Sequence, residues 1–323
     1  MSSASAETKA IVEVVAAVIM RPDGKFLLTR RPGGKLYSGY WEFPGGKVET
    51  GETLIQSMER ELWEELGIQV IHAQRWITRV FMYPHATVRL NFFRILAWNG
   101  KLEPREKQGL FWQSPEHVNV SPILPANTPI LRALRLPPIY AITHASEIGI
   151  ENSLIQIQTA FQQGLRLLQI REKTMERTSL LNFSTQVIAL AKTFQAKVLI
   201  NSDIELAHEV GADGVHLPAS QLMSISERPT TTESFLCGAS CHNAEELYAA
   251  EKLALDFVVL GPVQPTLTHP NGSTLGWNRF ARLIQNASVP VYALGGLRRN
   301  NLTMAQELGA HGIALMRGIA ADE

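Results

Sequence analysis

Eight short and almost continuously apolar runs in the second half of the chain most constrain its fold. The runs cover residues 139–143, 167–172, 198–202, 214–218, 236–242, 257–263, 290–296 and 312–318. Between each run and the next lies a stretch that is long enough for a helix. Strands that are apolar on both faces are typical of a parallel sheet with helices on both sides. Eight of them predict an α/β (β/α)8 TIM barrel, and an open doubly wound sheet is the rival architecture.

The first half of the chain has a different order of elements, which is typical of an α+β unit. Strands are expected over residues 12–20, 26–29, 75–83 and 86–98, and a helix over residues 53–66 that ends at Gly67. Paired prolines at 137 and 138 separate the two halves, because proline cannot continue a helix. We expect one domain over residues 1–135 and a second over residues 136–323, each long enough to bury its own core.

The charge balance and the cysteines restrict partners and compartment. Thirty basic and thirty acidic side chains give a formal net charge of zero, so no global field attracts duplex nucleic acid or an anionic membrane. The apolar stretch over residues 10–20 is short and contains Glu13, so we expect a strand there and no signal peptide or membrane span. Cys237 and Cys241 are separated by roughly 13 Å of expected strand, too far for a disulfide, which favours a cytoplasmic location.

Three glutamates share one face of the helix predicted over residues 53–66. Glu61, Glu64 and Glu65 stand at positions i, i+3 and i+4, so their carboxylates repel one another. Mg²⁺, or alternatively Mn²⁺, would resolve that repulsion because a hard divalent cation prefers oxygen ligands. Arg60 is four residues before Glu64 and is placed to orient the cluster. A solvated acidic face is the plainer interpretation, but it does not explain the Pro-Gly-Gly sequence in front or the spaced Glu52.

From Gly46 to Ile68 the sequence resembles, at every defined position, the box of the Nudix hydrolases. The resemblance implies a Nudix fold and a metal-dependent nucleoside triphosphate pyrophosphohydrolase. It implies that the metal ligands are the carbonyl of Gly46 and the carboxylates of Glu61, Glu64 and Glu65. Glu52 and Arg60 would orient the helix and the loop that precedes it.

Residues 12–134 are similar to the MutT branch of that family, which hydrolyses 8-oxo-dGTP to the monophosphate and pyrophosphate. The resemblance places Arg31 at a substrate-contacting arginine, Phe43 beside the base, and Glu106 as a further carboxylate supplied by a separate loop. An ordinary exposed loop glutamate is the alternative for Glu106. Either Glu61 or Glu106 could take the proton of the attacking water, and the sequence leaves both open.

Asn127 matches the MutT residue that reads the oxidised base. A carboxamide offers one acceptor and two donors, so it can accept from N7–H of 8-oxoguanine while it donates to O6. Ordinary guanine has a bare N7 that would face the amide oxygen, and the site would reject it through an unpaired buried polar group. A helix N-cap is the alternative role for this asparagine.

Residues 138–318 resemble the thiamine-phosphate synthase and TenI superfamily of barrels. Since barrel active sites lie at the carboxyl ends of strands, the resemblance implies a site there for a phosphorylated thiazole or pyrimidine. Arg171, Lys173 and Asn201 could hold a phosphate, and the Gly295-Gly296 turn could present N–H groups to another. The full candidate site is Gln169, Arg171, Lys173, Asn201, Ser240, His242, Thr266, Thr268, Gly295 and Gly296.

Three positions depart from the synthase pattern. Ser202 and Gln221 replace acidic metal ligands, and His269 replaces a lysine. Neutral side chains are poor ligands for a strongly hydrated ion, so we expect a barrel that does not make thiamine phosphate at a useful rate. Phosphate-ligand binding and thiazole tautomerisation remain, and His242 matches a histidine that the tautomerases use for proton transfer.

The favoured interpretation of the whole chain is an enzyme of nucleotide-pool sanitation that supports DNA repair. One alternative is a thiamine-pathway enzyme whose Nudix half hydrolyses thiamine diphosphate analogues. Another is a barrel that serves the hydrolase as a non-catalytic sensor or scaffold. Because the sequence stops soon after the eighth run, we expect the barrel flank to be covered by the first domain, the linker, or a second subunit in a homodimer.

Overall fold

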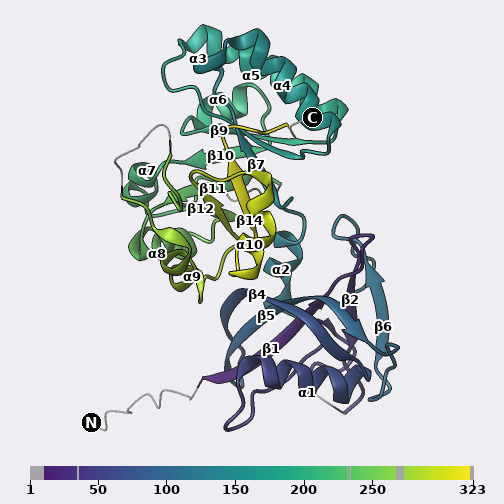
Figure 1. The fold of residues 1–323 in the computed structure, drawn as a ribbon. Coiled ribbons are helices and arrows are strands. Elements are labelled where there is room, and N and C mark those ends of the chain that lie inside the picture. The colour runs from purple at the N-terminus through teal and green to yellow at the C-terminus, as the bar shows by residue number, and fades with distance from the viewer. Residues whose placement is uncertain (1–10, 35, 231, 233, 267–272, 321–323) are drawn as a thin grey trace, which may run out of the picture. The chain divides into compact units, whose positions relative to one another are not determined.

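A computed structural model of the chain describes residues 11–34, 36–230, 232, 234–266 and 273–320 (Figure 1). The contacts divide the chain into two compact units, Met1–Arg135 and Leu136–Glu323. Across the described residues, no helix is both long and apolar enough to cross a bilayer.

The first unit is built on two three-stranded sheets. In one sheet, β5 (Thr87–Asn99) lies between the parallel β1 (Val12–Ile19) and the antiparallel β4 (Gln69–Met82). In the other sheet, β2 (Phe26–Arg30) lies between β3 (Trp41–Glu42) and β6 (Gly109–Gln113), both antiparallel to it. Four strands appear where the sequence predicts them, although β4 begins six residues earlier than expected. The sequence did not predict β3 or β6.

Helix α1 (Leu54–Leu66) follows the predicted limits because both of its ends are defined locally. Thr53 forms a capping box with Gln56 at the N-terminus, and Gly67 ends the helix in the left-handed conformation. Met58, Leu62 and Leu66 are fully buried against the apolar side chains of β1 and β5. Burial of this face leaves the glutamates of the opposite face directed away from the core.

A second apolar cluster of this unit surrounds Phe43, whose ring packs between Phe26 and Phe92. A 3-10 turn, η1 (Pro125–Asn127), leads into α2 (Thr128–Ala133), and Ile130 from α2 completes the cluster. Leu124 N also donates to Trp41 O at 2.9 Å, which holds the turn before α2 beside β3.

The second unit is a closed parallel barrel of eight strands, so the predicted barrel is confirmed and the open sheet is wrong. The strands are β7 (Ile139–Ile142), β8 (Leu167–Ile170), β9 (Lys197–Asn201), β10 (Gly214–Leu217), β11 (Leu236–Cys241), β12 (Phe257–Leu260), β13 (Val291–Leu294) and β14 (Gly312–Leu315). The described helices that follow or connect them are α3 (Ala145–Ile148), α4 (Ile150–Gln162), α5 (Arg177–Thr193), α6 (Ile204–Glu209), α7 (Ala219–Ser224), α8 (Ala244–Lys252), α9 (Gly276–Ile284), η2 (Arg299–Asn301) and α10 (Leu302–Glu307).

Both faces of the barrel strands are buried, which explains why their sequences are almost continuously apolar. Inward side chains such as Tyr140, Phe257 and Tyr292 pack together inside the barrel, whereas the outward ones pack against the helices. Cys237 and Cys241 belong to the outward set and are both free thiols, in agreement with the expected absence of a disulfide between them.

Candidate functional site

The carboxylates of α1 are organised around Arg60. Its Nε and Nη2 atoms donate to the two oxygens of Glu52, at 2.7 and 3.0 Å, and its Nη1 donates to Glu61 and Glu64, at 2.9 and 3.2 Å. The hydrogen bond from Arg60 lowers the pKa of Glu52 to about 2, so that carboxylate stays charged. Arg60 thus joins Glu52 to two of the three expected ligands, Glu61 and Glu64.

Glu61 and Glu65 lie where a negative charge is disfavoured. Burial is the main cause that raises the pKa of Glu65 to about 8; the carboxylates of Glu42, Glu106 and Glu61 act in the same direction, and one N–H from Gly45 opposes them. Burial also raises the pKa of Glu61, and Glu64 and Glu106 act in the same direction. The repulsion expected from the helical spacing is thus present, and a cation between these groups would relieve it.

Two glycines let the loop before α1 approach the acids closely. A Cβ atom on Gly46 would lie 2.3 Å from the Glu61 carboxylate, and one on Gly45 would lie 2.2 Å from the carbonyl oxygen of Val15. Gly45 has a φ of +141° and donates its N–H to Glu65 Oε2 at 3.1 Å. The carbonyl of Gly46, an expected metal ligand, accepts from Val15 N at 2.9 Å and keeps one lone pair for another partner.

The donor set fits a hard divalent cation, although the ligands do not yet converge. Glutamate carboxylates and a backbone carbonyl supply oxygen alone, the preference of Mg²⁺ and Mn²⁺. Within the described part of the chain, no three acidic, histidine or cysteine side chains are grouped tightly enough to hold an ion as they stand. Of the three expected ligands on α1, Glu64 is the most exposed, with 56% of its side chain accessible, and it is held by Arg60. Exposure leaves this side chain room to turn toward the others.

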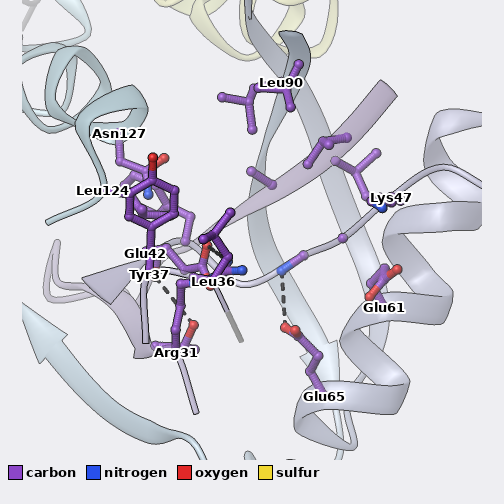
Figure 2. Close-up of a pocket in the computed structure, with 18 of the residues that line it drawn as sticks. Arg31, Leu36, Tyr37, Glu42, Lys47, Glu61, Glu65, Leu90, Leu124 and Asn127 are labelled. Carbon is purple, nitrogen blue, oxygen red and sulfur yellow. Dashed lines mark hydrogen bonds and ion pairs between the residues drawn. The ribbon is translucent and has the colours of Figure 1, made fainter. Parts of the chain in front are cut away.

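A cavity of about 490 Å³ extends from these carboxylates to Asn127 (Figure 2). In its middle, Arg31 Nη1 contacts both carboxylate oxygens of Glu42 at 2.7 Å, and Arg31 Nε donates to Leu36 O at 2.9 Å. Sequence reasoning missed Glu42 as the partner of Arg31. No sequence signal pointed to this pair, because β3 was not predicted and its register with β2, in which Thr29 lies opposite Glu42, is established only in the fold.

Aromatic side chains form one wall of the cavity. Tyr37, Tyr83 and His85 line it, and their ring centroids lie 5.4 to 6.0 Å apart. Burial raises the pKa of Tyr83 to about 12, so its phenol is neutral near pH 7. Phe43 borders the same cavity, but its side chain is only 3% exposed and belongs mainly to the core. The wall offers more accessible aromatic surface than Phe43 does.

Asn127 occupies the N-cap position of α2, yet its side chain makes no capping hydrogen bond. The residue is 4% exposed and lines the cavity at the end opposite Glu61 and Glu65 (Figure 2). The carboxamide of Asn127 therefore does not cap α2. An amide in so enclosed a place can discriminate between hydrogen-bond patterns of a bound ring.

The described candidate residues of the barrel lie on or beyond the carboxyl ends of its strands. Gln169 Nε2 donates to Asn201 Oδ1 at 3.1 Å, which joins β8 to β9 at this rim. Burial lowers the pKa of Arg171, whose backbone N–H donates to Thr143 Oγ1. Lys173, Thr266 and the Gly295-Gly296 turn follow β8, β12 and β13, and Thr268 lies outside the described residues.

The turn formed by Gly295 and Gly296 is tightly packed. Cβ atoms there would meet Pro262 at 2.6 Å and the carbonyl of Pro265 at 2.4 Å. Close approach to the segment after β12 therefore explains both glycines without a ligand. His242 is 56% exposed at its side chain and contacts Glu246 Oε2 through Nδ1 at 2.9 Å.

The two positions that replace acidic ligands are directly bonded to each other. Gln221 Nε2 donates to the carbonyl of Ser202 at 3.2 Å, and Asn201 Nδ2 donates to Ser202 Oγ at 3.3 Å. Asp203, the nearest acid in sequence, caps α6 by accepting from Leu206 N and forms an ion pair with Arg177 at 2.5 Å. Asp203 is thus engaged elsewhere, and this part of the rim is neutral.

A buried hydrogen-bonded chain that the sequence did not reveal supports Ser240. Its Oγ lies 2.9 Å from His216 Nε2, and His216 Nδ1 lies 3.3 Å from the hydroxyl of Tyr140. Burial lowers the pKa of His216 to about 3, with a further contribution from Arg171, and burial raises the pKa of Tyr140. His216 is therefore neutral, with one ring nitrogen as donor and the other as acceptor.

Comparisons with known proteins match each unit to a separate family. The model of thiamine monophosphate synthase matches residues 139–319, and that of the NUDIX domain matches residues 11–134. A putative thiamine-phosphate synthase 2 of Aquifex aeolicus is 35% identical over 181 residues, which is 56% of this chain and 96% of the relative. A putative thiamine-phosphate synthase of Geobacter sulfurreducens is 34% identical over 57% of this chain and 87% of its own length. A solved MutT structure from work on Aliivibrio salmonicida and Vibrio cholerae is 33% identical, covering 39% of this chain and 97% of its own, with a TM-score of 0.34.

Proposed function

The chain belongs to the thiamine monophosphate synthase family through its barrel and carries a NUDIX domain in front of it, and from this premise we propose that the NUDIX domain hydrolyses 8-oxo-dGTP. The products are 8-oxo-dGMP and pyrophosphate. The observation that carries the proposal is the placement of the Asn127 carboxamide, enclosed at one end of a cavity whose other end holds the α1 carboxylates.

In this proposal, some residues of the site hold and orient the metal ligands, and others transfer a proton. A divalent ion, when bound, neutralises charge on the phosphate oxygens and lowers the pKa of water. The ion would be held by the carboxylates of Glu61, Glu64 and Glu65 and by the Gly46 carbonyl. Arg60, which is itself bonded to Glu52, would orient Glu61 and Glu64. Glu61 and Glu106 are both close enough to the other acids to influence their pKa, and either can take the proton of the attacking water.

Base recognition is assigned to the end of the cavity that contains Asn127. Asn127 accepts from N7–H and donates to O6 of the oxidised guanine, whereas the bare N7 of guanine would face its amide oxygen. Tyr37 and Tyr83 offer ring faces to the flat base. Arg31 and its partner Glu42 line the same cavity, and we assign them to the sugar and the nearest phosphate (Figure 2).

A pyrophosphate-release screen tests the proposal with 8-oxo-dGTP, dGTP and thiamine diphosphate as substrates and Mg²⁺ present. We expect Asn127→Ala to lower the preference for 8-oxo-dGTP over dGTP by about 1–3 kcal/mol in kcat/KM while pyrophosphate release continues. Asn119→Ala, an exposed asparagine outside the cavity lining, is the matched control. An unchanged preference removes Asn127 from base recognition, and faster turnover of thiamine diphosphate favours the thiamine-pathway alternative.

For the barrel, we propose a site that binds a phosphorylated thiazole or pyrimidine but does not make thiamine phosphate. That synthesis releases pyrophosphate, and the related synthases hold a magnesium ion against it with acidic residues. At the positions that the resemblance matches to those acids, this chain has the neutral Ser202 and Gln221, and Gln221 donates to the Ser202 carbonyl, while Asp203 caps a helix and pairs with Arg177. Both contacts support the loss of the metal site.

The decisive assay mixes the purified chain with the pyrimidine diphosphate, the thiazole phosphate and Mg²⁺. We expect binding of the thiazole phosphate without formation of thiamine phosphate. Robust synthesis that is lost in Asp203→Ala would show that an acidic ligand has moved along the chain, and the proposal would then be wrong.

A further inference from the structure

The loop between β5 and β6 is fastened to the last turn of α1. Carbonyl groups at the end of a helix lack partners within the helix and need donors from elsewhere. The loop supplies them: Glu103 N donates to Leu66 O at 2.9 Å, and Arg105 N donates to Glu65 O at 3.0 Å. The guanidinium of Arg105 also donates to Trp63 O at 2.9 Å and lies over the Trp63 ring. These hydrogen bonds therefore hold the loop that carries Glu106 against the C-terminal end of α1.

Gln108 connects this anchor to Glu106 itself. Its Nε2 donates to Glu65 O at 2.8 Å, and its Oε1 accepts from the backbone N–H of Glu106 at 2.9 Å. Gln108 is only 6% exposed, whereas Glu106 lies on the exposed part of the loop. One buried carboxamide thus joins the backbone of a helix acid to the backbone of the loop acid.

We propose that Gln108 is a positioning residue that fixes the carboxylate of Glu106 relative to those of Glu61 and Glu65. A carboxamide is suited to this task because its donor and acceptor are held in one plane at a fixed separation. Loss of either bond leaves the backbone bonds of Glu103 and Arg105 in place but removes the one that holds the Glu106 N–H, next to Lys107 with its φ of +61°. The proposal rests on the hydrolase function proposed for the NUDIX domain, in which Glu106 acts at the metal or on the water.

Gln113 provides a matched control within the same unit. It is 1% exposed, its Nε2 donates to Trp112 O at 3.2 Å, and its Oε1 accepts from Asn119 N at 2.6 Å. It is not among the described residues that line the cavity. Methionine preserves the length of both glutamines and removes both hydrogen bonds, so Gln108→Met and Gln113→Met remove equivalent groups from equally buried places.

The test is a double-mutant cycle on the full chain with Gln108→Met and Glu106→Gln, measured as pyrophosphate release. We expect Gln108→Met to lower kcat by about 10–100-fold with little change in KM, the usual loss for a group that orients a metal ligand. In the Glu106→Gln background the same substitution should have no further effect, because the two residues act as a unit. Gln113→Met should retain kcat.

Several outcomes would overturn the proposal. They are an unchanged kcat in Gln108→Met, an equal loss in Gln113→Met, or losses from Gln108→Met and Glu106→Gln that multiply in the double variant. If Gln108→Met does not fold, hydrogen exchange in the wild type still decides, because the Glu106 amide should exchange slowly only if Gln108 holds it. Rapid exchange of that amide contradicts the proposal.

Failure of the proposed hydrolase function can be distinguished from failure of the proposal about Gln108. If the wild type releases no pyrophosphate from any nucleotide, Mn²⁺ binding replaces turnover as the measurement. The proposal then requires weaker Mn²⁺ binding in Gln108→Met than in Gln113→Met, and equal binding in the two variants overturns it.

Discussion

Metal binding by the NUDIX domain should release a proton from Glu65. Burial and the neighbouring acids raise the pKa of this carboxyl to about 8, so that it is mostly protonated at pH 6 and half protonated near pH 8. A cation binds the carboxylate and not the acid, and its apparent affinity therefore follows the deprotonated fraction. That fraction falls roughly 50-fold between pH 8 and pH 6 for a pKa of about 8. The raised pKa of Glu61 acts in the same direction.

Calorimetric titration with Mn²⁺ at pH 6, 7 and 8 measures this dependence. At pH 7, repeating the titration in two buffers of different ionisation enthalpy counts the protons released, and we expect about one. Glu65→Gln is the informative variant, because it keeps the shape of the side chain and removes its titration. Its affinity should be lower and should depend less on pH than that of the wild type.

Three results would refute the reasoning. The first is a Mn²⁺ affinity that does not change between pH 6 and pH 8, and the second is the absence of proton release at pH 7. The third is an equal pH dependence in Glu65→Gln, which would place the titrating group elsewhere. Any of them would mean that Glu65 is already charged in the metal-free protein.

Two further predictions concern stability. Because the pKa of Glu65 is raised in the folded state, its contribution to stability is full below its unfolded value of about 4.5 and is lost as the pH rises to about 8. The metal-free NUDIX domain should therefore melt at lower temperature at pH 8 than at pH 5, and Mg²⁺ should reverse the loss; a melting temperature that rises with pH contradicts this. Leu62→Ala, at a fully buried position of α1, should cost about 2–5 kcal/mol in denaturant unfolding, and a loss below 1 kcal/mol would show that α1 is not anchored there.

Elements that are defined locally could be predicted from the sequence. The limits of α1 depend on Thr53 and Gly67, which act within one turn of the helix. The barrel strands are recognisable because both of their faces are buried, so apolar residues dominate each run and only a few polar side chains, such as Gln169 and His216, interrupt it. The short strands β3 and β6 carry no such signal, since they form only through their pairing with β2.

Contacts between distant segments could not be predicted. Gln108 meets Glu65 across 43 residues, and His216 meets Tyr140 across 76. Neither pair has a spacing that points to contact, because a loop docked on a helix end and two non-adjacent barrel strands come together only in the folded unit. The sequence therefore indicates which acids belong to the carboxylate helix but not what holds the loop acid beside them.

The two sites also show opposite solutions to the same electrostatic problem. In the NUDIX domain, burial and neighbouring carboxylates raise the pKa of both Glu61 and Glu65, which destabilises the charged, metal-free form. Arg60 offsets part of that repulsion through bonds to Glu61 and Glu64. At the barrel rim, Ser202 and Gln221 are neutral, and Gln221 donates to the carbonyl of Ser202. A site that retains costly charge has a reason to bind metal, whereas these two side chains carry no charge for a cation to neutralise; metal removal should therefore affect the first unit and leave the folding of the second unchanged.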